Sequence, residues 1–126
     1  MNNKYLIGVV FAVAATISVL LPATAQASPT NVCAADRPCI TELYQSGRTV
    51  HIGWDGHQDF SHYNFRWSRP GRAESQHETG GGAGGGVTIK NVRAGTVYTV
   101  KVQGCDKPVF SPSRCTPWAE RTITTR

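Results

Sequence analysis

Leucine is almost absent from most of this 126-residue sequence, since only Leu43 follows position 27. In residues 28–126, 16 of 99 side chains are Leu, Ile, Val or Phe, a level that by itself leans toward disorder. So little leucine argues against a helix bundle, and 99 residues leave no room for a large catalytic domain. Nine aromatic residues and four cysteines in the same segment favour a small folded domain instead.

The signals of metal and phosphate sites are also missing. The cysteine spacings are C-x5-C and C-x9-C, without the C-x2-C pair typical of structural zinc, and the four histidines are scattered. The glycine-rich run at 80–86 lacks the Lys-Ser/Thr pair of a phosphate-binding loop. We therefore expect no metal and no cofactor, and we interpret the glycine run as a flexible connection, the most mobile part of the domain.

Catalytic groups occur in the sequence without a convincing arrangement. One short segment contains His57, Asp59, Ser61 and His62, and Glu74 lies four residues before Glu78. A nucleophile needs a positioned base, and paired carboxylates need a substrate cleft, and neither is indicated here. We expect no catalytic residue and no enzyme activity.

Residues 1–27 have the parts of a secretory signal peptide. Lys4 supplies the positive start, the run from Tyr5 to Leu21 is mostly apolar, and Ala25-x-Ala27 provides the small residues that a signal peptidase requires. We expect cleavage after Ala27, with cleavage after Ala25 or retention as a membrane anchor as alternatives. No second long apolar run follows, so we expect a secreted protein without stable membrane insertion after cleavage. We also expect it to be a monomer.

Residues 28–126 carry 12 basic and 8 acidic side chains, a net charge of +4, and no run of five like charges. This balance fits either a solvated basic surface or attraction to an anionic polymer outside the cell. We expect no nucleic-acid partner, because the protein is exported and its aromatic residues are assigned to the core.

The even number of cysteines after the signal predicts disulfides. Four cysteines allow three connectivities, and we favour Cys33–Cys39 and Cys105–Cys115 because both close short loops. Residues 28–40 then form an N-terminal arm held by the first bond.

Apolar and polar residues alternate in several short segments, which is typical of strands with one buried face. In the first clear case Val50, Ile52 and Trp54 alternate with polar or small residues, and Asp55-Gly56-His57 has the turn composition that would end the strand. Arg69-Pro70-Gly71-Arg72 is a second turn. The expected strands are 41–44, 49–54, 63–68, 86–90, 97–102 and 121–124, which together indicate a small antiparallel sandwich or barrel.

The segment Val92-Arg93-Ala94-Gly95-Thr96-Val97-Tyr98-Thr99-Val100 resembles the corner before the F strand of a fibronectin type III domain. Trp54, Tyr63-Asn64-Phe65-Arg66 and Pro117-Trp118 resemble that family's strand B, strand C and entry to strand G. The resemblance covers residues 41–125, and we take residues 41–126 as the domain. It implies an all-β, immunoglobulin-like sandwich of about seven antiparallel strands. It also implies that the Tyr98 hydroxyl bonds to backbone upstream in the corner. The implied core residues are Trp54, Tyr63, Phe65, Tyr98, Val100 and Val102.

The loop from Cys105 to Cys115, which the resemblance makes the F–G loop, is the best candidate for binding. Two prolines and the expected disulfide restrict it, so ordering on binding costs little. It would present an apolar tip with basic neighbours, formed by Lys107, Val109, Phe110 and Arg114. In the alternative, Phe110 folds back over the end of the sandwich.

We therefore predict a secreted fibronectin type III-like module that binds an extracellular protein or polysaccharide. Two alternatives remain, a structural component of the cell envelope without a specific ligand and a secreted inhibitor that uses the F–G loop.

Overall fold

The structure, a computed structural model, describes residues 33–126 as an all-β protein with antiparallel strands, as predicted. The expected signal peptide lies outside the described residues. Within residues 33–126 no helix is long and apolar enough to cross a membrane. The six strands are β1 (Cys39–Ser46), β2 (Thr49–Ser68), β3 (Ser75–Lys90), β4 (Val97–Asp106), β5 (Arg114–Cys115) and β6 (Ala119–Thr124).

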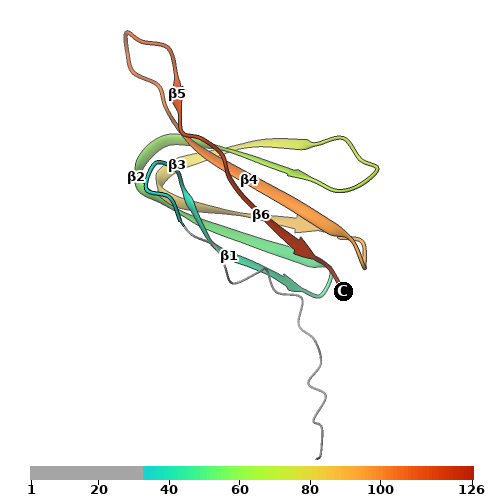
Figure 1. The fold of residues 1–126 in the computed structure, drawn as a ribbon. Coiled ribbons are helices and arrows are strands. Elements are labelled where there is room, and N and C mark those ends of the chain that lie inside the picture. The colour runs from blue at the N-terminus through green and yellow to red at the C-terminus, as the bar shows by residue number, and fades with distance from the viewer. Residues whose placement is uncertain (1–32) are drawn as a thin grey trace, which may run out of the picture.

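Strands β2 and β3 are long and take part in both layers of the sandwich (Figure 1). Residues 49–55 of β2 lie between β1 and the second half of β3. Residues 62–68 of β2 lie between the first half of β3 and β4, and β4 pairs in turn with β6. One layer is therefore β1–β2–β3 and the other is β3–β2–β4–β6, and the two are joined where β2 and β3 bend together.

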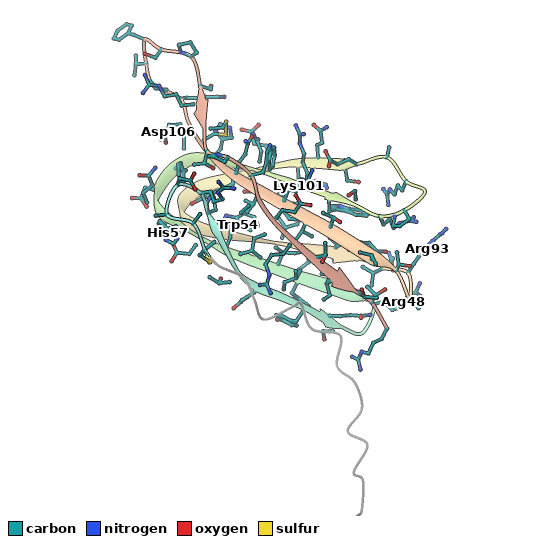
Figure 2. All side chains as sticks on the ribbon, in the orientation of Figure 1. Arg48, Trp54, His57, Arg93, Lys101 and Asp106 are labelled. Carbon is teal, nitrogen blue, oxygen red and sulfur yellow. A yellow bond between two sulfur atoms is a disulfide. The ribbon has the colours of Figure 1, made fainter. Side chains whose placement is uncertain are left out.

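The core consists of the apolar members of the alternating strands. Trp54 comes from the three-stranded layer and lies between the layers (Figure 2). Its ring is stacked 5.9 Å from that of Phe65 and meets the ring of Tyr63 edge-on at 5.6 Å. The structure buries each residue assigned to the core, Trp54, Tyr63, Phe65, Tyr98, Val100 and Val102. These few aromatic rings fill the space that leucine occupies in most domains.

The turn before β4 has the contact that the resemblance implies. The buried Tyr98 places its hydroxyl oxygen 2.8 Å from the backbone nitrogen of Arg93, which donates the hydrogen bond. Gly95 occupies the turn with φ of 59°, a conformation that side chains rarely adopt. The Tyr98 hydroxyl therefore ties the corner to β4.

Replacing Tyr98 with phenylalanine is expected to lower the free energy of unfolding by about 1 kcal/mol, because the ring keeps its packing and only the hydrogen bond is lost. Chemical denaturation of the two proteins measures this difference. Equal stabilities would show that the Arg93–Tyr98 bond contributes nothing.

The prediction that Asp55-Gly56-His57 ends a strand is wrong. β2 continues through these residues, with a shift of register between Asp55 and Phe60 and a positive φ of 66° at His57. The expected strands 49–54 and 63–68 are therefore one continuous strand, and residues 33–126 form six strands in total. Turn-forming residues produce a bend here, and β3 follows β2 around it and pairs with β2 on both sides of the bend.

The interpretation of residues 80–86 as a flexible connection is also wrong, because these glycines belong to β3 and most of them pair with β2. A Cβ atom on Gly81 would lie 2.3 Å from the carbonyl oxygen of Phe60. One on Gly84 would lie 2.5 Å from the carbonyl oxygen of Trp54. Glycine is needed because the two backbones approach too closely in the bend for a side chain to fit between them.

Candidate functional site at the F–G loop

Both predicted disulfides are confirmed, with bonds Cys33–Cys39 and Cys105–Cys115. The second joins the end of β4 to the short strand β5, and the F–G loop, residues 105–115, projects beyond the sandwich (Figure 1). Cys105 is fully buried, whereas Cys115 is exposed. The loop is therefore anchored in the core at one side and held by the disulfide at the other.

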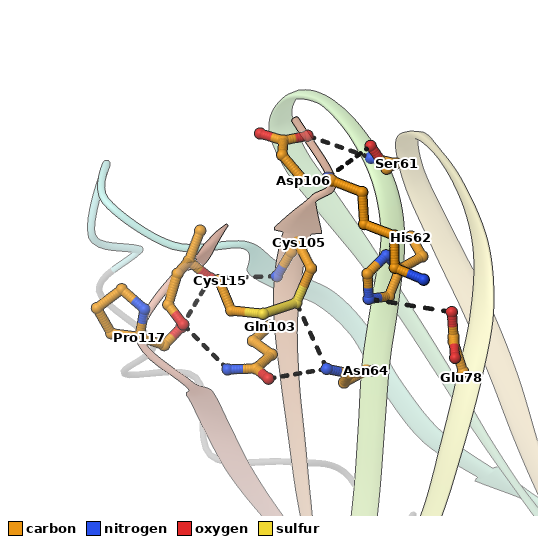
Figure 3. The surroundings of a disulfide bond; sticks show 12 residues. Ser61, His62, Asn64, Glu78, Gln103, Cys105, Asp106, Cys115 and Pro117 are labelled. Carbon is orange, nitrogen blue, oxygen red and sulfur yellow. Dashed lines mark hydrogen bonds and ion pairs between the residues drawn. A yellow bond between two sulfur atoms is a disulfide. The ribbon is translucent and has the colours of Figure 1, made fainter. Parts of the chain in front are cut away.

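Backbone and side-chain hydrogen bonds fix the base of the F–G loop. Asp106 Oδ1 accepts a hydrogen bond of 3.3 Å from the Ser61 backbone nitrogen (Figure 3). Ser61 Oγ accepts a hydrogen bond of 3.3 Å from the Lys107 backbone nitrogen. On the other side, the Thr116 backbone nitrogen donates to the Gly104 carbonyl at 2.8 Å. The base is thus attached to β2 as well as to its own hairpin.

The tip of the loop exposes two large apolar side chains. Phe110 is 99% exposed and Val109 is 89% exposed, and Lys107 and Arg114 beside them are exposed as well. The alternative in which Phe110 folds back over the end of the sandwich is therefore wrong. Exposed apolar side chains on a supported projection are a typical feature of a contact surface.

Below the disulfide, a chain of side-chain amides connects β2, β4 and the segment between β5 and β6. Asn64 Nδ2 donates to Gln103 Oε1 at 2.9 Å and lies 3.4 Å from Cys105 Sγ. Gln103 Nε2 then donates to the Thr116 carbonyl at 3.1 Å (Figure 3). Because each amide is engaged, this surface is held in place next to the loop.

Negative charge gathers near the bend of β2. Burial first, and then the charges of Asp55, Asp59 and Asp106, raise the pKa of the Tyr63 phenol above its ordinary value. The phenol therefore keeps its proton and donates a 2.7 Å hydrogen bond to the Gly82 carbonyl. This contact holds the bend of β3 against β2 and gives Tyr63 a structural role.

The segment 57–62, which contains possible catalytic groups, makes contacts with neighbouring strands and with the F–G loop. Ser61 is bonded to the F–G loop, and His62 Nε2 lies 4.0 Å from Glu78 Oε1. Glu74 is paired with Arg66 at 3.4 Å instead of with Glu78. Within residues 33–126, no cluster of three His, Cys, Asp or Glu residues could hold a metal ion.

Sequence reasoning missed the polar outer face of the four-stranded layer, which adjoins the loop. Its side chains, such as Asn64, Arg66 and Gln103, are the polar members of the same alternation that identified the core. The alternation shows which residues point outward, but their neighbours depend on the register between strands.

No known protein family and no curated protein matches this sequence. Among solved structures, the fold is similar to that of the Br derivative of BhCBM56, a carbohydrate-binding module. The two chains are 14% identical and superpose with a TM-score of 0.52, over 71% of this chain and 95% of the other. At this level of identity the likeness establishes the fold.

Proposed function

We propose that this protein is a secreted, non-catalytic module that binds an extracellular polysaccharide through its F–G loop. The observation that carries the proposal is the loop itself, with a fully exposed Phe110 on a base fixed by a disulfide and by bonds to Ser61. Such a loop loses little conformational freedom on binding, so more of the contact energy appears as affinity.

Two observations favour a polysaccharide over a protein ligand. A phenyl ring can stack on the apolar face of a sugar ring, while Lys107 and Arg114 beside it can donate hydrogen bonds to hydroxyl groups. The similar fold of a carbohydrate-binding module supports the same class of ligand. An extracellular protein partner would need a larger continuous apolar surface than Val109 and Phe110 provide.

We also propose that the domain is of the fibronectin type III kind, acts as a monomer and is exported. The Tyr98 contact in the corner before β4 supports the family assignment. The two disulfides support an oxidising compartment outside the cytoplasm.

Replacing Phe110 with alanine is expected to weaken binding to the polysaccharide at least about tenfold, a loss of about 1.4 kcal/mol. The melting temperature should stay at the wild-type value, because Phe110 has no packing to lose. The measurement is retention of the disulfide-bonded protein on a panel of neutral polysaccharides (glucans, chitin, xylan, mannan) and acidic ones (polygalacturonate, alginate).

Tyr44→Ala is a matched control, because Tyr44 is also an aromatic residue at the surface. It is 44% exposed and lies on β1, in the three-stranded layer. It should bind like the wild type. A Phe110→Ala protein that binds as tightly as the wild type would remove the F–G loop from the binding surface.

The same projecting loop also suits a second function, that of a secreted inhibitor that inserts residues 107–114 into the active site of a protease. Inhibition of a panel of extracellular proteases by the wild type, and loss of inhibition in Phe110→Ala or Lys107→Ala, would favour that function. A protein that binds no polysaccharide and inhibits no protease would fit a structural component of the cell envelope.

A further inference from the structure

The outer face of the four-stranded layer carries a row of polar side chains on neighbouring strands. Asn64 lies opposite Glu78 of β3 and Gln103 of β4, and two residues further along Arg66 lies opposite Gln76 and Lys101. Directly opposed residues of antiparallel strands point to the same side of the sheet. These side chains therefore form one continuous surface, which begins next to the F–G loop.

A hollow of about 290 Å³ opens on this surface between β2 and β3. The residues that line it from the outward side are Asn64, Arg66, Gln76 and Glu78. They provide a carboxylate, a guanidinium and two amides, so both hydrogen-bond donors and acceptors face the hollow. The side chain of Gln76 is exposed on this face.

Two of the lining groups are held in position before any ligand arrives. The guanidinium of Arg66 lies over the ring of Trp118, 4.7 Å from its centroid, and its Nη1 is 3.4 Å from Glu74 Oε1. Asn64 is fixed by the hydrogen bond that its side-chain amide donates to Gln103. Groups that are already ordered lose little entropy on binding. A ligand that forms only a few hydrogen bonds to them can therefore still bind.

The charge on this face does not match the charge of the whole domain. The residues that share the face or lie over it carry two positive charges (Arg66, Lys101) and three negative ones (Glu74, Glu78, Glu120). The positive excess lies outside this face: Lys107 and Arg114 are on the F–G loop, and Arg48 and Arg93 are at the opposite end of the sandwich from that loop (Figure 2). A polyanion would gain nothing here, whereas an uncharged ring with several hydroxyl groups can satisfy donors and acceptors alike.

We infer that the hollow lined by Asn64, Arg66, Gln76 and Glu78 binds an uncharged sugar residue of the polysaccharide. This inference rests on the proposed function and adds to it a second contact surface and a preference for neutral over acidic polymers. Because β4 runs from this surface directly into the F–G loop, one polysaccharide chain can contact both.

The test compares the wild type with the double variant Gln76→Ala/Glu78→Ala on the polysaccharide panel. We expect the variant to lose affinity for a neutral polysaccharide at least about tenfold and to keep the wild-type melting temperature, since both side chains are exposed. Glu42→Ala/Thr88→Ala is the matched control, because it makes the same change of charge on the outer face of the other layer. It should bind like the wild type.

A second measurement does not depend on the stability of a variant. Titration of the wild type with a soluble neutral oligosaccharide should shift the side-chain amide NMR signals of Asn64 and Gln76. Raising the salt concentration should leave the affinity unchanged, because no net charge is neutralised on binding.

Two results would overturn the inference and leave the proposed function standing: equal binding of wild type and double variant to a neutral polysaccharide, or wild-type binding to acidic polymers alone. Failure of the wild type to bind any polysaccharide would overturn both. Unshifted Asn64 and Gln76 signals at saturating oligosaccharide would also exclude the hollow as the binding site.

Discussion

Replacing Trp54 with alanine is expected to lower the free energy of unfolding by about 3–5 kcal/mol, the usual cost of truncating a buried aromatic residue. Trp54 is 4% exposed, and its ring contacts both Tyr63 and Phe65. The loss would therefore remove contacts between the two layers as well as apolar area. Urea denaturation followed by circular dichroism measures the change without relying on tryptophan fluorescence.

Trp118→Ala is the appropriate comparison, because Trp118 is a half-buried tryptophan on the outer face that stacks on Arg66. We expect it to cost about 1 kcal/mol, the value of a partly exposed cation–π contact. Equal losses from the two substitutions would show that Trp54 does not connect the layers.

Replacing Gly81 with alanine is expected to destabilise the protein by about 3 kcal/mol, the upper part of the range for overpacking a close contact. The added Cβ would lie 2.3 Å from the Phe60 carbonyl oxygen and 2.4 Å from that of Ser61. Backbone atoms cannot rotate away as a side chain can, so β3 would have to separate from β2. Thermal and urea unfolding measure the effect.

The neighbouring glycine provides an internal control. A Cβ on Gly80 meets no atom within 4 Å, and its φ lies outside the left-handed region. Gly80→Ala should therefore be neutral or stabilise by up to about 1 kcal/mol, because alanine restricts the unfolded chain more than glycine does. If both variants were equally stable, the close approach of β2 and β3 in the bend would be disproved.

The strands and the buried faces could be predicted because each depends on a short alternating pattern. Val50, Ile52 and Trp54 identify one buried face without knowledge of the rest of the chain. The two disulfides could be predicted for a similar reason, since each closes a loop of few residues. Local patterns are sufficient where the structure is determined by neighbours in sequence.

The bends could not be predicted, because Asp-Gly and a run of glycines have the same composition whether they end a strand or bend one. The difference depends on residues about 30 positions away, since glycine is needed at position 84 because the Trp54 carbonyl oxygen of β2 lies against it. The hollow near Asn64 escaped prediction for the same reason. Its four polar side chains come from two strands whose register the sequence does not reveal.

The bend in β3 also bears on self-association. β3 pairs with β2 along one edge and with no other strand of residues 33–126, so it forms the edge of both layers over 16 residues. A straight edge of that length would be a template on which another copy could add a strand. The glycines divide it into two short segments that belong to different layers and face different directions (Figure 1). A second chain could pair with only one of them at a time, which protects the molecule against edge-to-edge aggregation.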